Sequence, residues 1–158
     1  RATVCAPGTT RSSLFFDAFD PIAPSRWTTS DGLQAGLTAG WASSGVKSLY
    51  ITDPSSVNDL RLTLDLSDTV LPTGAFLRFN HAFMLDANYG PTVLFDGGVV
   101  EIRSKAPGGD WGAWNDAGAL IDSGTPYTGA VTSAANPLVG RDAFGGASLG
   151  YGSSRIDL

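Results

Sequence analysis

The sequence has little of what most catalytic and metal sites require. In 158 residues it contains one cysteine, Cys5, and one histidine, His81. A zinc protease motif of the H-E-x-x-H type is therefore impossible, and no spacing of histidine and cysteine would complete a tetrahedral zinc site. Because hydrolysis needs a nucleophile, a base within hydrogen-bond reach and an oxyanion stabiliser, we predict no catalytic residues and no enzyme activity.

Charge is also scarce. Charged residues make up 16% of the chain and the formal net charge is −5, whereas roughly 25% is typical of globular domains. The basic residues form no cluster, so we expect neither nucleic acid nor an anionic membrane surface as a partner. No run approaches the ~20 apolar residues of a membrane helix.

Glycine and proline, by contrast, are abundant and spread along the chain. The sequence has 20 glycines, 9 prolines and 42% hydrophobic residues. Many short connections with special backbone angles would require this composition, and a helix-rich fold would not. The length suits one domain with a core of its own.

Alternation of apolar and polar residues predicts several strands. Leucines alternate with polar residues over residues 60–66, and a second alternating run covers residues 75–85 after the turn at Pro72 and Gly74. Further strands are expected at residues 14–19, 92–95, 99–104 and 154–158, with a returning segment that begins at Trp111. Short strands separated by turn signals predict an all-β sandwich or barrel.

The order of landmarks resembles one known family. They are FFDAFD at 15–20, Trp27, Trp41, LRLTLDLSD at 60–68, FLRFNHAFMLD at 76–86, FDGGVVEIRS at 95–104 and GGDWGAWND at 108–116. This order is similar to that of the jelly-roll, MAM-like accessory domain of immune inhibitor A-like and related secreted bacterial peptidases. The resemblance spans residues 14–158 and leaves residues 1–13 as a linker or lead-in.

The resemblance implies a two-sheet antiparallel β-sandwich of jelly-roll type in a secreted, extracellular bacterial protein. Such a domain is non-catalytic: it stabilises the catalytic domain, or binds a substrate or the cell surface, and its partners are the other domains of the parent protein. Family members continue through roughly two further strands and sometimes carry a late cysteine. We therefore expect that the sandwich lacks its last strands in this chain, and that Cys5 has its partner elsewhere.

Two pairs of acidic residues are candidate sites. The resemblance places a structural calcium ion near Asp17 and Asp20, since calcium takes six to eight oxygen ligands; the alternative is two solvated carboxylates at a strand end. Asp96 and Glu101 form the second pair. A glycosidase would require a defined separation between them, whereas an aspartate before two glycines is first of all a turn residue.

His81 lies on the apolar face of the predicted strand at 75–85. We interpret it as a core histidine whose imidazole bonds to a carboxylate or a backbone group. The resemblance groups His81, Asp86, Asp96 and Glu101 as a structural polar cluster.

Tryptophans provide the candidate ligand surface. Trp111 and Trp114 lie beside the Gly108-Gly109 turn, where exposed rings would bind a glycan or peptide. Packing is the alternative for both, and Trp27 and Trp41 are expected in the core. Three functions follow: an accessory module of a secreted peptidase, a carbohydrate-binding module, or an assembly piece completed by another chain.

Overall fold

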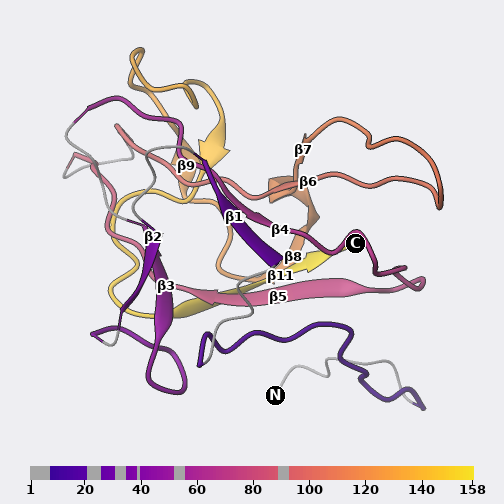
Figure 1. Cartoon of the computed structure of the whole chain (residues 1–158). Coiled ribbons are helices and arrows are strands. Elements are labelled where there is room, and N and C mark those ends of the chain that lie inside the picture. The colour runs from indigo at the N-terminus through magenta and orange to yellow at the C-terminus, as the bar shows by residue number, and fades with distance from the viewer. Residues whose placement is uncertain (1–7, 21–25, 31–34, 39, 52–55, 89–92) are drawn as a thin grey trace. The chain divides into compact units, whose positions relative to one another are not determined.

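The computed structural model describes residues 8–20, 26–30, 35–38, 40–51, 56–88 and 93–158. Its regular structure consists of antiparallel strands and short 3-10 turns such as η2 (Gly118–Leu120), so the expected all-β class is confirmed (Figure 1). The chain divides into two compact units. Unit 1 comprises Arg1–Ile51 and Leu62–Val70, and unit 2 comprises Thr52–Arg61 and Leu71–Leu158.

Unit 1 contains two pairs of short strands. Strand β1 (Trp27–Thr29) pairs with β4 (Leu62–Leu64), and β2 (Ala35–Thr38) pairs with β3 (Ser48–Ile51). The residues flanking β1 and β4 hold that pair together: Arg26 makes a two-pronged contact with Asp68, with both N–O distances 2.9 Å. The guanidinium hydrogen bond holds the pKa of Asp68 at about 2.

Unit 2 is built on a three-stranded sheet with the order β5-β11-β8. The strands are β5 (Phe76–His81), β11 (Gly152–Asp157) and β8 (Ile121–Gly124). Gly152 lies opposite His81, and Asp157 lies opposite Phe76. Alternate residues of β11 are buried, because Ser154 and Ile156 point into unit 2 and are 1% and 0% exposed.

The core of unit 2 lies beneath this sheet. Its fully buried apolar residues are Leu94, Ala117, Val131, Ala143, Phe144 and Ile156. The ring of Phe144 contacts those of His81, Tyr127 and Phe83, with centroid separations of 4.6, 4.8 and 5.6 Å. Isolated bridges from Leu94 to Val131 and from Gly98 to Phe144 connect the loops of this core.

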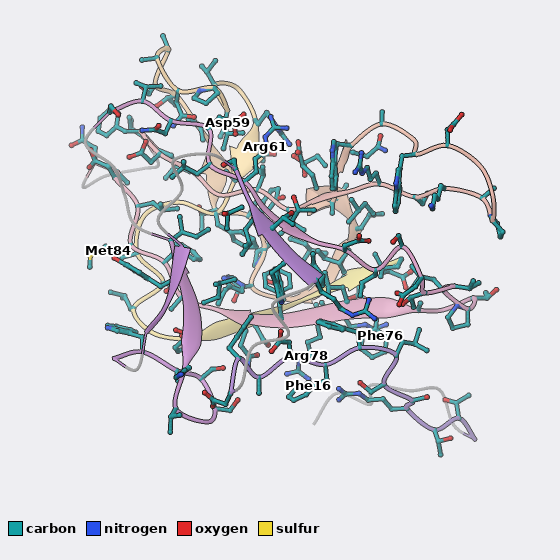
Figure 2. The ribbon with its side chains drawn as sticks, viewed as in Figure 1. Phe16, Asp59, Arg61, Phe76, Arg78 and Met84 are labelled. Atoms are coloured by element: carbon teal, nitrogen blue, oxygen red, sulfur yellow. The ribbon has the colours of Figure 1, made fainter. Side chains whose placement is uncertain are left out.

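Two further strand pairs complete unit 2. Strand β6 (Glu101–Ile102) pairs with β7 (Asn115–Asp116), and β9 (Gly129–Ala130) pairs with β10 (Asp142–Ala143). Figure 1 shows the chain between β6 and β7 as a long hairpin that extends away from the other strands of unit 2. At another edge of the unit, the side chain of Met84 points outward and is 84% exposed (Figure 2).

Most of the expected strands exist, but they are shorter than the sequence pattern predicts. The run at 60–66 forms a strand only at Leu62–Leu64, the run at 75–85 only at Phe76–His81, and the run at 99–104 only at Glu101–Ile102. In the run at 92–95, residue 92 lies outside the described residues and Leu94 forms isolated bridges. The segment at 154–158 is confirmed as a strand, and it is the central strand of its sheet.

Two expectations in unit 1 are wrong. Residues 14–19 form no strand, because the Asp17 carboxylate accepts a hydrogen bond from the Phe19 N–H and Phe19 adopts a φ of 62°, which bends the chain. Trp41 is not a core residue, since it is 61% exposed. Residues 8–13 are exposed and contain no strand, and Cys5 lies outside the described residues.

Candidate functional site

The hairpin between β6 and β7 is fixed at its base by charge. Glu101 and Asp116 are direct partners across the two strands, so two carboxylates lie on one face. Nη2 of Arg141 contacts both, at 2.9 Å from Glu101 Oε1 and 2.6 Å from Asp116 Oδ2. Burial alone would raise the pKa of Asp116, but hydrogen bonds from Arg141, Gly118 and Tyr127 outweigh it, so that pKa lies below its usual range.

The uncharged hydroxyl of Tyr127 also holds the two strands at the base of the hairpin. The Val100 N–H donates to the Tyr127 hydroxyl at 2.8 Å, and this hydroxyl lies 3.2 Å from Asp116 Oδ1. Burial raises the pKa of Tyr127 to about 12, so the phenol stays protonated and can donate to the carboxylate. The strands β6 and β7 are therefore attached to the segments that carry Tyr127 and Arg141.

The tip of the hairpin is a tight turn. The Gly109 N–H donates to the Ala106 carbonyl at 2.9 Å, and Gly108 has a φ of 74°. Proline followed by a residue of positive φ is the pattern of a type II turn, and Pro107-Gly108 supplies it. Below the turn, the Gly112 N–H donates to the Ser104 carbonyl at 2.9 Å, which holds the two arms together.

The arms carry a stack of aromatic and cationic side chains, and we call residues 103–114 the tryptophan hairpin. Cζ of Arg103 lies 4.8 Å from the ring centroid of Trp111 and 4.5 Å from that of Trp114. Nζ of Lys105 lies 4.9 Å from the Trp111 ring. Even so, Trp111 and Trp114 are 41% and 40% exposed. Trp111 and Trp114, the candidate ligand-binding residues, are therefore only partly buried, and each ring already contacts a cationic side chain.

His81 lies among aromatic rings, as expected, but its hydrogen-bond partner is a hydroxyl. Its Nε2 is 2.8 Å from Ser154 Oγ, and that hydroxyl lies 2.6 Å from the Thr125 carbonyl. The expected bond to a carboxylate or backbone group is therefore corrected. Because the carbonyl can only accept, Ser154 donates to Thr125 and the imidazole donates to Ser154. Burial lowers the pKa of His81.

Of the other members of the expected polar cluster, Asp86 and Asp96 are joined through the backbone, and Glu101 has a different partner. The backbone carbonyl of Asp86 accepts from Phe95 and Asp96 at 2.9 and 3.2 Å. The Asp96 carboxylate accepts from Asn136 at 3.1 Å, while Glu101 pairs with Arg141. The contact between Asp86 and Asp96 therefore joins part of the expected cluster, whereas His81 bonds to Ser154 and Glu101 to Arg141.

Asp17 and Asp20, the expected calcium ligands, are used differently by unit 1. Both carboxylate oxygens of Asp17 accept hydrogen bonds, from Phe19 N–H at 2.7 Å and Trp27 Nε1 at 2.9 Å, so Asp17 fits a structural anchor better than a metal ligand. Asp20 accepts from Val46 N–H at 2.7 Å through Oδ2, while its buried Oδ1 has no partner. In the described part of the chain no three His, Cys, Asp or Glu side chains converge on a metal position, and the calcium site stays a prediction.

Sequence reasoning missed a G-x-S-x-G pattern at residues 146–150, centred on Ser148. In hydrolases this motif needs a sharp turn from a strand into a helix, but here the next regular element is strand β11. Ser148 Oγ accepts from Phe83 N–H at 2.9 Å and donates to the Gly150 carbonyl at 2.7 Å. The Ser148 hydroxyl therefore stabilises the loop through its hydrogen bonds. The neighbouring residue Leu149 has a φ of 54° and an exposed side chain.

Comparison with family models, with curated protein sequences and with solved structures gives no significant match. Among the described residues, none of the helical segments has the length and apolar character needed to cross a membrane.

The residues that sequence reasoning did not select are those that connect distant segments. Arg103 is separated from its two tryptophans by eight and eleven positions, and Arg141 is forty positions from Glu101. The sequence signal that could have indicated Arg103 is its position on the arm opposite Trp111 and Trp114, before the predicted turn at Gly108-Gly109.

Proposed function

We propose that this chain is a non-catalytic binding module of a larger secreted protein, with its ligand site on the tryptophan hairpin. The observation that carries this function is the pair of half-exposed indole rings, Trp111 and Trp114, on an arm that projects from unit 2 (Figure 1). Exposed tryptophans at a rigid, protruding position are typical of recognition surfaces.

The arrangement around the one histidine supports a non-catalytic role. A serine nucleophile must give its proton to the histidine that activates it. In the contact between His81 and Ser154 the hydrogen bond has the opposite direction, because the imidazole N–H donates to the hydroxyl oxygen. Ser154 is also 1% exposed. The Ser154 hydroxyl is therefore not presented to a substrate.

The architecture supports the accessory-domain part of the function. In the sheet β5-β11-β8 the last strand of the chain lies between two earlier ones, a crossover that jelly-roll sheets contain. We propose, on this basis, that the strands belong to a jelly-roll sandwich. Of the roles that the family resemblance implies, the projecting hairpin favours binding of a substrate or cell surface over stabilisation of a catalytic domain.

Binding can be tested with the purified chain and insoluble ligands. We expect retention on a polysaccharide or cell-wall preparation, and loss of retention in the double variant Trp111→Ala/Trp114→Ala. Trp41→Ala is the matched control, because Trp41 is more exposed but lies in unit 1. Equal retention of the double variant and the native chain would show that the ligand site lies outside the tryptophan hairpin. Hydrolysis of casein or a glycan that is lost in His81→Ala would overturn the non-catalytic role.

A second candidate, strand addition by another chain, is favoured by the position of β5. Within unit 2, β5 pairs with β11 on one side and ends the sheet. Its alternating burial would let an added strand continue both faces. Mass measurement in solution tests it: a dimer that Arg78→Pro disrupts supports strand addition, because the backbone of Arg78 faces the outer edge of β5, and a monomer at high concentration contradicts it.

A further inference from the structure

We infer, on the basis of the proposed function, that the tryptophan hairpin binds acidic polysaccharides built from hexuronate units. Each such unit presents an apolar face of C–H bonds and a carboxylate on the same ring. The hairpin presents indole faces and basic groups side by side, so both features of the sugar have a matching partner.

The first observation is that the cations of the hairpin are unpaired. Arg26, Arg61, Arg141 and Arg155 each form an ion pair with a carboxylate. In the described part of the chain, neither Arg103 nor Lys105 has such a partner, although the chain carries a net charge of −5. Asp110 at the tip is the one acidic residue of the hairpin, so residues 103–114 carry a net positive charge.

The second observation is the stacked geometry of Arg103. Its guanidinium lies over the rings of Trp111 and Trp114, and a stacked guanidinium keeps its N–H donors at its rim, in the plane of the group. Contact with the two rings therefore restricts the position of Arg103, and within the described residues its N–H groups form no ion pair. An oriented guanidinium is well suited to a bidentate bond with a carboxylate.

The third observation separates the roles of the two tryptophans. Trp111 lies against both Arg103 and Lys105, whereas Trp114 contacts Arg103. The indole of Trp114 has the less occupied faces, and we assign it to stacking against the sugar ring. Trp111 orients the two cations that receive the carboxylate.

The decisive experiment compares two polymers with the same backbone. Polygalacturonate carries a carboxylate on every ring, and highly methyl-esterified pectin carries a neutral ester instead. We expect the native chain to bind polygalacturonate at least about tenfold more tightly than the ester, because a charge-assisted hydrogen bond is being removed. Added salt should weaken only the polygalacturonate complex.

Variants assign the preference to residues. Arg103→Gln should bring the affinity for polygalacturonate down to that for the ester, and Trp114→Ala should weaken binding of both polymers. Lys47→Gln is the matched control, since it removes one exposed positive charge from unit 1 and should change neither affinity.

Three results would overturn the inference in distinguishable ways. Equal affinity for the two polymers, with loss in Trp114→Ala, would remove the acidic preference and leave the binding function in place. Equal binding of polygalacturonate and single-stranded oligothymidylate would reduce the site to a general anion surface. Binding of neither polymer, combined with retention on cell-wall material that the tryptophan variants do not change, would contradict the proposed site itself.

Discussion

Arg78 and Arg155 lie directly opposite each other in the antiparallel pair β5-β11, so two guanidinium groups share one face of the sheet. Arg155 has partners: its guanidinium lies 4.6 Å from the Phe76 ring centroid and 3.3 Å from Asp122. The guanidinium of Arg78 makes a hydrogen bond to the Ser153 hydroxyl at 3.4 Å, and within the described residues it forms no ion pair. Like charges directly opposite each other destabilise a sheet.

Replacing Arg78 by glutamate should therefore stabilise unit 2. Arg78→Glu turns a repulsive cross-strand pair into an attractive one, and we expect a gain of about 0.2–1 kcal/mol in the free energy of unfolding. Urea denaturation at low ionic strength measures it. Arg78→Gln should give an intermediate gain, and high salt should reduce the difference between the variants. Unchanged stability in Arg78→Glu would show that the repulsion is already screened, and a loss of stability would contradict the repulsion.

The two glycines of the Asp96-Gly97-Gly98 motif should differ sharply in their tolerance of a side chain. A Cβ on Gly97 would lie 2.7 Å from both Ala143 Cβ and Val131 Cγ2, whereas a Cβ on Gly98 meets nothing within 4 Å. Because overpacking of a core costs roughly 1–3 kcal/mol, Gly97→Ala should lower the unfolding free energy by about that amount. Gly98→Ala is the matched control, and equal effects would contradict the close packing of Gly97.

The Asp96-Gly97-Gly98 motif shows how much of the structure could be predicted from the sequence. The strand at Phe76–His81 and the turn at Pro107 and Gly108 follow from local chemistry, whereas the motif itself forms a bend at Phe95 and Asp96. What the motif did not reveal is that Gly97 is needed for contact with Val131 and Ala143. That contact joins segments more than thirty positions apart, and no local pattern encodes it.

The same limit applies to the candidate site. The position of Trp111 and Trp114 beside a glycine turn was visible in the sequence, but their stacking on Arg103 depends on the register of β6 and β7. Strands β9 and β10 were not predicted, because each is two residues long and has no period to detect. Their pairing is stabilised by tertiary contacts, which override local propensity.

Loss of the Tyr127 hydroxyl should loosen the base of the tryptophan hairpin. In Tyr127→Phe the ring still packs on Phe144, but the Val100 N–H loses its acceptor. An unsatisfied buried donor costs about 1–3 kcal/mol, and hydrogen exchange at Val100 should accelerate accordingly. Tyr151→Phe is the control, since Tyr151 is partly exposed outside this network. Unchanged exchange at Val100 would mean that water replaces the hydroxyl.

Stability should depend on pH between 7 and 5 through His81 alone. It is the only histidine in the sequence, and other side chains titrate mainly outside this range. Burial lowers the pKa of His81 in the folded state below the 6.5 of the unfolded chain. As the pH drops, His81 is therefore protonated in the unfolded chain before it is protonated in the folded one. The free energy of unfolding should therefore fall as the pH drops from 7 toward 5, and level off above 7, where both states are neutral. Urea denaturation across this range should show the slope in the native chain and not in His81→Asn, whatever the absolute stability of the variant. The same slope in both chains would assign the titration to another group, and a flat profile in the native chain would mean that His81 is as readily protonated when folded as when unfolded.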